Sequence, residues 1–221
     1  MTTFALIGAG PGLGAAVARR FGREGFDIAL ISRNQDHLDA LAAELHQDGI
    51  HARGFAADVS DQQALTAALD AATATLGPIE VLQYSPVPHP DFMKPVLSTR
   101  PEDLHGPLAF SLFGPMTAME QALPGMRELG RGTLLFVNGG SAVRPHPERA
   151  GTSIAFAAES AYATMLHDAL APENIHVAQL IIPGAIAAGD EHTDPALLAD
   201  TLWNLHHQRG AFRHYASPMD T

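Results

Sequence analysis

The chain has 221 residues, of which 46% are hydrophobic and 17% charged, and its formal net charge is −11 at pH 7. This length and composition are typical of one globular domain with a sizeable core. The negative charge argues against nucleic acid and anionic membrane surfaces as partners, and the absence of cysteine excludes disulfides and thiolate metal sites. No apolar run reaches the length of a membrane span, and the first residues, MTTFALIGAG, lack the basic region of a signal peptide, so we expect a cytoplasmic protein.

Short runs rich in Val, Ile and Leu alternate with helical patterns along the whole chain. Their continuous apolar character is typical of parallel strands that are covered on both faces. The alternation predicts an α/β fold, a Rossmann-type doubly wound parallel sheet of about seven strands with helices on both faces, as a single domain over residues 1–221. The expected strands are Phe4–Ile7, Ile28–Ser32, Gly54–Ala57, Ile79–Tyr84, Thr133–Val137, His176–Ile182 and the shorter run Phe212–Tyr215.

Three of the expected helices carry start signals. Asn34 precedes leucines at helical spacing and is predicted to be an N-cap. Ser60 followed by Gln63 has the spacing of a capping box, which predicts that the next helix starts there. Asp194 before a proline predicts the start of the last long helix, Pro195–Gln208.

Two further long helices are expected over residues 107–128 and 153–170. The proline-rich stretch Pro86–Pro101 follows the fourth expected strand. Prolines at this density do not continue a helix or a central strand. We therefore predict that this stretch is a surface excursion at the carboxyl edge of the sheet rather than a boundary between domains.

Glycines follow the first expected strand in the stretch LIGAGPGLGAAVARRF. They allow a tight turn and close approach of the backbone to a pyrophosphate, which the N-terminus of the next helix attracts. The strand before them and the helix after them are the context that a dinucleotide-binding loop requires. The residues predicted to form this loop are Gly8, Gly10, Pro11, Gly12, Leu13 and Gly14.

The second expected strand ends in ALISRN, where an NAD-specific site would place an acid for the adenosine ribose. Ser32 and Arg33 stand there instead, with Asn34 next to them, and a hydroxyl beside a guanidinium suits a 2′-phosphate. NADP(H) is therefore favoured over NAD(H), the alternative being a solvated surface arginine. Asp58, followed by Val59 after the third strand, is able to accept a hydrogen bond from an adenine amino group, or else belongs to the turn before the next helix.

Several stretches in this order resemble the short-chain dehydrogenase/reductase family. They are Gly8-xxx-Gly12-x-Gly14, SRN at 32–34, ADVS at 57–60, LPGM at 123–126, GGS at 139–141 and IHVAQLIIPGAI at 175–186. The resemblance implies a nicotinamide-dependent oxidoreductase acting on a carbonyl or alcohol, and a homodimer or homotetramer built through the helices 107–128 and 153–170. It also implies cofactor contacts from Ser85, Pro183, Gly184 and Ile186.

Members of the family are expected to use a serine, a tyrosine and a lysine four residues after the tyrosine, with an asparagine on the preceding helix. The best register on the helix 153–170 puts Ala155 at the tyrosine and Glu159 at the lysine. The only lysine in the chain is Lys94, so the sequence contains no Tyr-xxx-Lys. Tyr162 lies about 10 Å further along the helix axis and is expected to be a packing residue.

The remaining catalytic candidates are Ser141, Ser111 and Glu159. Ser141 is the nearest match to the family serine, although an ungapped count gives Ala142. Ser111 falls at the asparagine position, and Pro115, four residues later, has no N–H to bond its carbonyl. A carboxylate at Glu159 is able to accept hydrogen bonds from ribose hydroxyls, the alternative being a solvated helix acid.

The twelve histidines are scattered without ligand spacing, so no metal site is expected. His146 and His192 fall on loops at the carboxyl edge and are alternative proton donors. Two functions follow from the sequence. The first is an NADP(H)-dependent oxidoreductase with a non-standard proton donor and a small-molecule substrate. The second is a protein that keeps the fold without redox chemistry, as a cofactor-binding regulator or subunit, or as an isomerase or cyclase that uses the pocket as a template.

Overall fold

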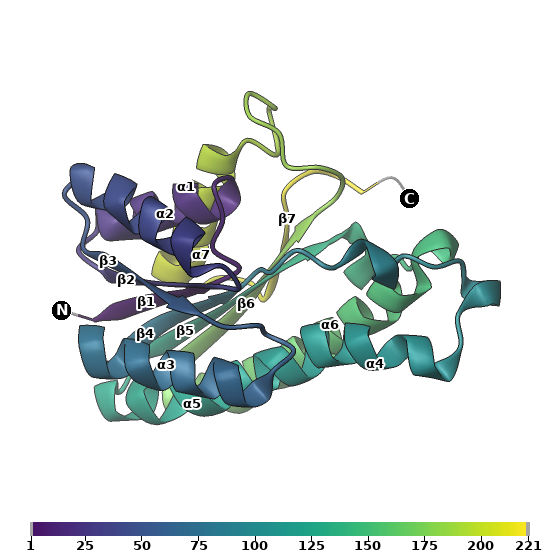
Figure 1. Ribbon diagram of the computed structural model, residues 1–221, viewed down its shortest axis with the longest axis horizontal. Helices are drawn as coiled ribbons and strands as arrows, with labels where there is room; N and C mark the ends of the chain where they lie inside the picture. Colours follow the sequence, from purple (N-terminus) through teal and green to yellow (C-terminus); the bar gives the residue numbers. More distant parts are fainter. Residues whose placement is uncertain (1, 220–221) are drawn as a thin grey trace.

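The strands form one seven-stranded sheet in the order β3-β2-β1-β4-β5-β6-β7, and every neighbouring pair is parallel (Figure 1). The structure is a computed structural model that describes residues 2–219. The strands are β1 (Thr3–Ile7), β2 (Asp27–Ser32), β3 (Ala52–Ala56), β4 (Ile79–Tyr84), β5 (Gly132–Gly139), β6 (Ile175–Ile182) and β7 (Arg213–Tyr215). The predicted doubly wound parallel sheet is confirmed.

Two strands differ most from the sequence-based bounds, and pairing with a neighbour explains both. β3 begins at Ala52, earlier than predicted, because Ala52 pairs with Ile28 of β2. β5 runs on to Gly139 because this glycine pairs with Ile182 at the end of β6. Apolar content alone does not reveal such extensions, since backbone pairing with one neighbouring strand accommodates glycine and arginine.

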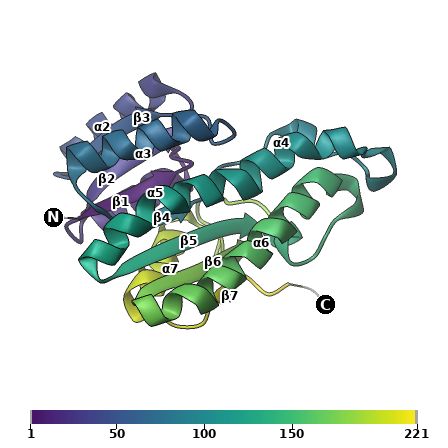
Figure 2. The same cartoon turned by 90° about the horizontal axis from the view of Figure 1, so that it is seen from below.

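Helices cover both faces of the sheet in two layers (Figures 1 and 2). One layer holds α1 (Leu13–Gly22), α2 (Gln35–Gln47) and α7 (Pro195–Gln208), and the other holds α3 (Gln62–Leu76), α5 (Gly114–Leu129), α6 (Ala150–Leu170) and the short α4 (His105–Leu108). Side chains of β1 alternate between the layers: Phe4 and Leu6 join one buried cluster, and Ile7 joins the other. Burying one such side chain stabilises the fold by about 1.5–3 kcal/mol.

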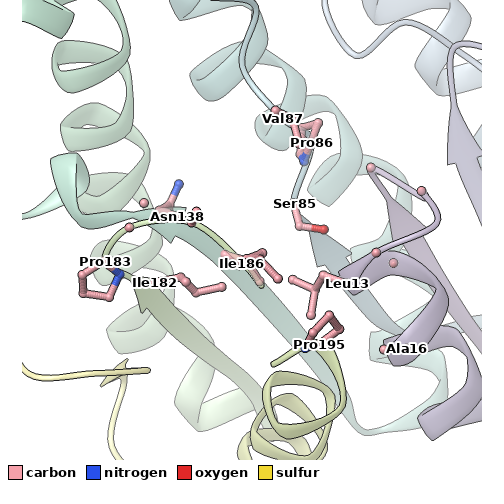
Figure 3. Close-up of a pocket in the computed structure, with 18 of the residues that line it drawn as sticks. Leu13, Ala16, Ser85, Pro86, Val87, Asn138, Ile182, Pro183, Ile186 and Pro195 are labelled. Atoms are coloured by element: carbon pink, nitrogen blue, oxygen red, sulfur yellow. The ribbon is translucent and has the colours of Figure 1, made fainter. Parts of the chain in front are cut away.

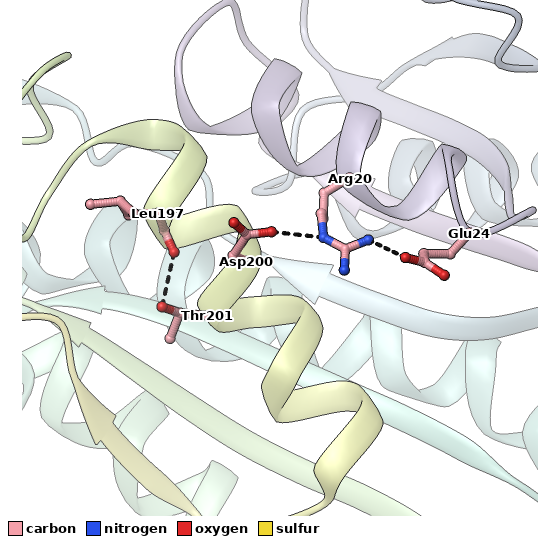
Figure 4. A network of polar contacts seen from close by, with 5 residues as sticks. All are labelled: Arg20, Glu24, Leu197, Asp200 and Thr201. Atoms are coloured by element: carbon pink, nitrogen blue, oxygen red, sulfur yellow. Dashed lines mark hydrogen bonds and ion pairs between the residues drawn. The ribbon is translucent and has the colours of Figure 1, made fainter.

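The helices α1 and α7 lie against each other beside the carboxyl edge (Figure 4). The Arg20 Nε donates to Asp200 Oδ1 at 2.8 Å, and the same guanidinium pairs with Glu24 and lies 4.8 Å from the Trp203 ring centroid. The Trp203 ring also packs edge-on against Phe21, with 5.2 Å between the ring centroids. Exposed ion pairs contribute about 0–1 kcal/mol, so the buried aromatic contact holds the two helices together more than the charges do.

Two of the three predicted helix starts are confirmed, and one is wrong. Asn34 caps α2 by accepting the His37 N–H, and Asp194 caps α7 by accepting the Ala196 N–H. The capping box predicted at Ser60 does not form. The Ser60 N–H donates to Asp58 in a tight turn, and the next residue, Asp61, becomes the N-cap of α3. Asp61 Oδ1 accepts the N–H groups of Gln63 and Ala64 at 3.0 Å each.

The helix expected over 107–128 is divided by a π-helical turn, Ala109–Phe113, between α4 and α5. The cause is Pro115, which removes a donor from the α-helical ladder and makes wider local geometry favourable. The side-chain hydroxyl of Tyr84, at the end of β4, donates to the carbonyl of Phe110 in this turn. The proline therefore changes the helix locally, and a side chain from the sheet satisfies a carbonyl there.

The helix α6 is 21 residues long and begins three residues before its predicted start. The stretch Pro86–Pro101 packs on this end: the Ala150 N–H donates to the Lys94 carbonyl at 2.9 Å. A Cβ at Gly151 would lie 2.6 Å from the Phe92 carbonyl oxygen, so only glycine fits. The stretch itself is a series of short 3-10 turns with exposed side chains, as predicted. Within residues 2–219, no helix combines the length and apolar character needed to cross a membrane.

Candidate active site

A cleft of about 1450 Å³ lies at the carboxyl edge of the sheet, where the strand order reverses between β1 and β4. Doubly wound folds bind ligands at this position. Its walls come from the loops after β1 and β4, the end of β5, the start of α6 and the segment after β6. Figure 3 shows Ser85 and Pro86 on the β4 side of this cleft, and Ile182 and Pro183 on the β6 side.

The predicted glycine loop lines one end of the cleft. Gly8 has a φ of +98°, and a Cβ there would lie 2.6 Å from backbone atoms of Ser85 and Pro86. Gly10 and Gly12 differ, because a Cβ on either would meet no protein atom within 4 Å and would instead occupy the cleft. The helix α1 that follows has no side-chain cap and no acid in its first turn. This end fits the pyrophosphate of a dinucleotide, since both backbone approach and a positive helix end are available.

Ser32 and Arg33 lie just outside the cleft lining, at the end of β2. The strand is tied to the glycine loop because the N–H groups of Gly8 and Ala9 both donate to the Ile31 carbonyl, at 2.9 and 3.1 Å. Arg33 is exposed, and within residues 2–219 its side chain has no hydrogen bond or ion pair. The side chain of Asn34 caps α2 by accepting the His37 N–H. The guanidinium of Arg33 is thus available beside the dinucleotide-type loop.

Asp58 and Val59 also lie outside the cleft lining, after β3. Asp58 is exposed, and its Oδ1 accepts the Ser60 N–H at 2.8 Å, which is the turn role considered for it. Val59 is buried and belongs to the hydrophobic core on the α3 side. A ligand at the edge of β3 would therefore meet only the second carboxylate oxygen of Asp58.

The other predicted cofactor contacts, Ser85, Pro183, Gly184 and Ile186, all line the cleft. Ser85 joins the ends of two central strands: its Oγ donates to the Ile7 carbonyl at 3.2 Å and accepts from Gln83 Nε2 at 2.9 Å. Gly184 takes a positive φ of +87°, which turns the chain after β6. These positions complete a continuous wall along the sheet edge.

The three predicted catalytic residues are not brought together. Ser141 lines the cleft after β5, and within the described residues its hydroxyl has no hydrogen-bond partner. Ser111 and Glu159 are buried, with 2% and 1% of their surface exposed, and neither lines the cleft. For Ser111 the prediction concerned its backbone carbonyl, and the residue does lie in the π-helical turn before Pro115. For Glu159 the burial differs from the solvated helix acid considered as its alternative.

Glu159 is enclosed in the protein interior rather than solvated on the helix surface. Burial raises the pKa of its carboxyl well above the usual range, and the adjacent Asn138 amide lowers it by less. Within residues 2–219, Glu159 Oε1 has no hydrogen-bond partner. Because desolvation disfavours the charged form, the fold favours the protonated carboxyl.

Thr152 and Phe156 are the residues four apart on α6 that do line the cleft. Phe156 packs with Ala142 and Ile181 in a small buried cluster. Thr152 is 5% exposed, and its Oγ1 has no partner within the described part of the chain. The register that placed positions 155 and 159 on this face is wrong. The sequence offered no clear correction, since AGTSIAFAAES has small or apolar residues on every face of the helix.

Charged side chains gather on the same wall. Arg144, His146 and Arg149 line the cleft between β5 and α6. His146 is exposed, and its Nδ1 accepts the Glu148 N–H at 3.2 Å. His192, the other histidine considered as a proton donor, does not line the cleft. Within residues 2–219 no group of three or more His, Asp or Glu side chains is placed to hold a metal ion.

Tyr162 is a packing residue, as expected. Its hydroxyl contacts the Met119 Sδ at 3.1 Å, which joins α6 to α5. Burial, with a smaller contribution from the charge of Glu120, raises the pKa of this phenol to about 12. Tyr162 does not line the cleft.

Comparison with known proteins places this geometry in context. A family model described as short chain dehydrogenase matches residues 2–194. A crystal structure of a short-chain dehydrogenase from Rhodopseudomonas palustris is 28% identical, with a TM-score of 0.86 and 99% of each chain covered. The L-sorbose reductase of Gluconobacter frateurii, solved with NADPH and L-sorbose, is 20% identical over 97% of this chain and 94% of its own, with a TM-score of 0.86.

Curated relatives match over shorter stretches. The D-threitol dehydrogenase of Mycolicibacterium smegmatis is 43% identical over 81 residues, which are 36% of this chain and 31% of that protein. Across the first four such relatives, the match spans between 10% and 45% of the relative's length. These partial matches leave substrate and activity to be argued from the site itself.

Proposed function

Because the chain belongs to the short-chain dehydrogenase family, we propose that it is an oxidoreductase that binds NADP(H) and interconverts a carbonyl and an alcohol on a small molecule. The observation that carries the proposal is the glycine loop. Gly10 and Gly12 leave an open cradle in front of an uncapped helix at the switch point of the sheet. The bound nicotinamide would supply or accept the hydride.

The residues of the chain divide the work of holding that cofactor. The backbone around Gly12 and the first turn of α1 would bind the pyrophosphate. Arg33 would bind a 2′-phosphate, which is the basis for preferring NADP(H), and the presence of NADPH in the L-sorbose reductase structure is consistent with this choice. Pro183 and Ile186 would form the wall at the nicotinamide end.

We propose that the proton is handled without a tyrosine–lysine pair. The positions four apart on the cleft face of α6 are Thr152 and Phe156, and the only lysine of the chain is Lys94. Ser141 is the candidate to polarise the substrate oxygen, and His146 or water is the candidate to exchange the proton. Loss of a positioned acid costs about 10²–10⁴-fold in rate, so slow turnover is expected.

A second candidate function is supported by the same helix. Phe156 fills an apolar cluster where an ammonium would be needed, so the cleft would bind cofactor without transferring hydride. The protein would then act as a cofactor-binding regulator or subunit, or as a catalyst without redox chemistry. The two candidates share the nucleotide end and differ only in whether bound NADPH is consumed.

We also propose a homodimer or homotetramer built through α5 and α6. Exposed apolar side chains on this surface support it: Phe113 in the π-helical turn, Met116 on α5, and Ile154 and Met165 on α6. Burying such a patch against a second copy is favourable. Sedimentation velocity tests this proposal, and a monomer at micromolar concentration would contradict it.

Two measurements test the redox proposal. NADPH and NADH are first titrated by fluorescence, and binding of NADPH at least tenfold tighter is expected. Oxidation of bound NADPH is then followed in a single turnover with a panel of aldehydes and ketones. Consumption of NADPH with any of them supports the oxidoreductase. Tight binding of NADPH without its oxidation by any compound of the panel favours the second candidate. If neither NADPH nor NADH binds, both candidates are overturned.

A further inference from the structure

The wall of the cleft between β5 and α6 is positively charged in a protein whose formal net charge is −11. Arg144 and Arg149 line this wall, and within residues 2–219 no carboxylate from the same stretch does. Glu148, the nearest acid in sequence, is exposed and outside the lining. The carboxylates that do line the cleft, Asp194 and Asp200, belong to the α7 side. Within residues 2–219, an anion entering this part of the cleft would therefore meet no acid in the lining between β5 and α6.

The start of α6 adds to this potential. The helix is 21 residues long, has no side-chain cap and has no acid in its first turn. Such a helix end carries a partial positive charge. Arg149 stands at the N-cap position, is exposed, and has no side-chain partner within residues 2–219. Its guanidinium therefore remains able to bind a carboxylate or phosphate in a bidentate manner.

A buried hydroxyl at the same place points independently to a ligand. Thr152, one turn into α6, lines the cleft and is 5% exposed. Its Oγ1 has no hydrogen-bond partner within the described residues. Buried polar atoms are rarely left unpaired, because leaving one without a partner is unfavourable. A ligand oxygen at the start of α6 would supply the missing partner.

The phosphate groups of the cofactor do not account for the charge of this wall. Its pyrophosphate is assigned to the glycine loop before α1, and its 2′-phosphate to Arg33 at the end of β2. The glycine loop follows β1 and Arg33 follows β2, and in the sheet order both strands lie on the other side of the switch point from β5. The positive wall is thus left for the substrate.

We propose that the substrate carries an anionic group, a carboxylate or a phosphate, and that this group binds at the start of α6 between Arg149 and Thr152. This inference rests on the proposed function in one respect, which is that the anionic ligand is identified as the substrate. Arg149 supplies the charge and paired N–H donors, and Thr152 supplies a hydroxyl. A neutral ketone of the same shape would lose these contacts.

The binding test uses isothermal titration of the whole protein, with and without NADP⁺, against benzoate, phenyl phosphate and neutral benzamide. We expect the better of the two anions to bind at least about tenfold more tightly than benzamide at low salt, and its identity distinguishes carboxylate from phosphate. Arg149→Gln should reduce anion affinity by about tenfold, and the isosteric Thr152→Val by a few-fold. The matched control is Arg53→Gln, which removes the same charge from an exposed position on β3 and should change nothing.

Benzamide binding as tightly as both anions would overturn the anion site, and so would equal losses in Arg149→Gln and Arg53→Gln. A second experiment compares the turnover of 4-carboxybenzaldehyde with that of its methyl ester. The kcat/KM for the acid should be at least tenfold higher than for the ester, and Arg149→Gln should abolish this difference. If none of the aldehydes and ketones of the panel, these two included, oxidises NADPH while anion binding depends on Arg149, the redox proposal fails and the anion site stands. If both aldehydes react equally and anions bind no better than benzamide, the anion site fails and the redox proposal stands.

Discussion

The two ends of the cleft differ in what forms them, the backbone at one end and side chains at the other. At the α1 end the backbone makes the site: Gly8, Gly10 and Gly12 act through the absence of a side chain. At the α6 end side chains make it, and Thr152 and Phe156 face the cleft there. A backbone-built site is retained as long as its glycines and the fold are retained, whatever the neighbouring side chains are. A side-chain-built site changes by substitution while the helix stays in place. Membership of the family therefore predicts the structure of the α1 end better than that of the α6 end.

The largest expected effect comes from rebuilding the side-chain end. Thr152→Tyr with Phe156→Lys would place a phenol and an ammonium four residues apart on the face of α6 that lines the cleft. If hydride transfer is limited by the missing acid, the single-turnover rate of NADPH oxidation should rise by about 10²–10⁴-fold. The comparison pair, Ala155→Tyr with Glu159→Lys, should unfold the protein, because neither position lines the cleft and the larger side chains would have to fit into the interior. A soluble rebuilt variant with no gain in rate would contradict an acid-limited redox enzyme.

The backbone-built end is tested by Gly8→Ala. A Cβ would lie 2.6 Å from backbone atoms of Ser85 and Pro86, and the φ of +98° is unfavourable for alanine. We expect a loss of about 2–4 kcal/mol in the free energy of unfolding, measured by urea denaturation, together with weaker NADPH binding. Gly25→Ala is the matched control, since its φ of +93° is similar but no atom lies within 4 Å of the added Cβ. Equal losses in both variants would show that conformational strain, and not the contact between β1 and β4, explains the effect.

Much of the fold could be predicted from the sequence because its signals are local. The caps at Asn34 and Asp194 and the continuous apolar strands depend on neighbours in the chain. The misplaced cap at Ser60 shows the limit, since two acids flank it and only the turn geometry decides that Asp61 caps α3. A sequence with several cap-forming residues in a row leaves this choice to the three-dimensional structure.

The site was harder to predict at the α6 end than at the α1 end. Glycine spacing after a strand is a property of the backbone, so it transfers directly from sequence to structure. Which face of α6 meets the cleft depends on where the helix begins and on how it packs against β6 and the turn after β5. Small and apolar residues occur on every face of α6, so the sequence pattern does not indicate which face lines the cleft. For this reason Glu159 is predicted to face the cleft, although it lies in the interior.

The buried carboxyl beside the cleft sets a pH-dependent stability. The folded-state pKa of Glu159 is raised above the unfolded value of 4.5, so its protonated form favours the fold, and that contribution is lost as the pH rises above about 4.5. Glu159→Gln removes the titration and keeps the shape. We expect it to stabilise the protein by about 1–3 kcal/mol at pH 8 and by much less at pH 5, as measured by urea denaturation. Glu128→Gln, on an exposed position of α5, is the control, and a gain for Glu159→Gln that does not change with pH would contradict the buried neutral carboxyl.

The smallest expected effect lies at the nucleotide end, where one side chain is added to a backbone-built site. Arg33 is exposed, and its side chain has no partner within residues 2–219, so its loss should leave the fold unchanged. Arg33→Gln should weaken NADPH binding by about tenfold, because a charge-assisted bidentate contact with the 2′-phosphate is lost, and it should leave NADH binding unchanged. Fluorescence titration of both nucleotides measures the ratio, with Arg53→Gln as the charge-matched control on β3. An equal loss for NADPH and NADH would mean that cofactor selection, like cofactor binding, rests on the backbone and the strand ends rather than on this guanidinium.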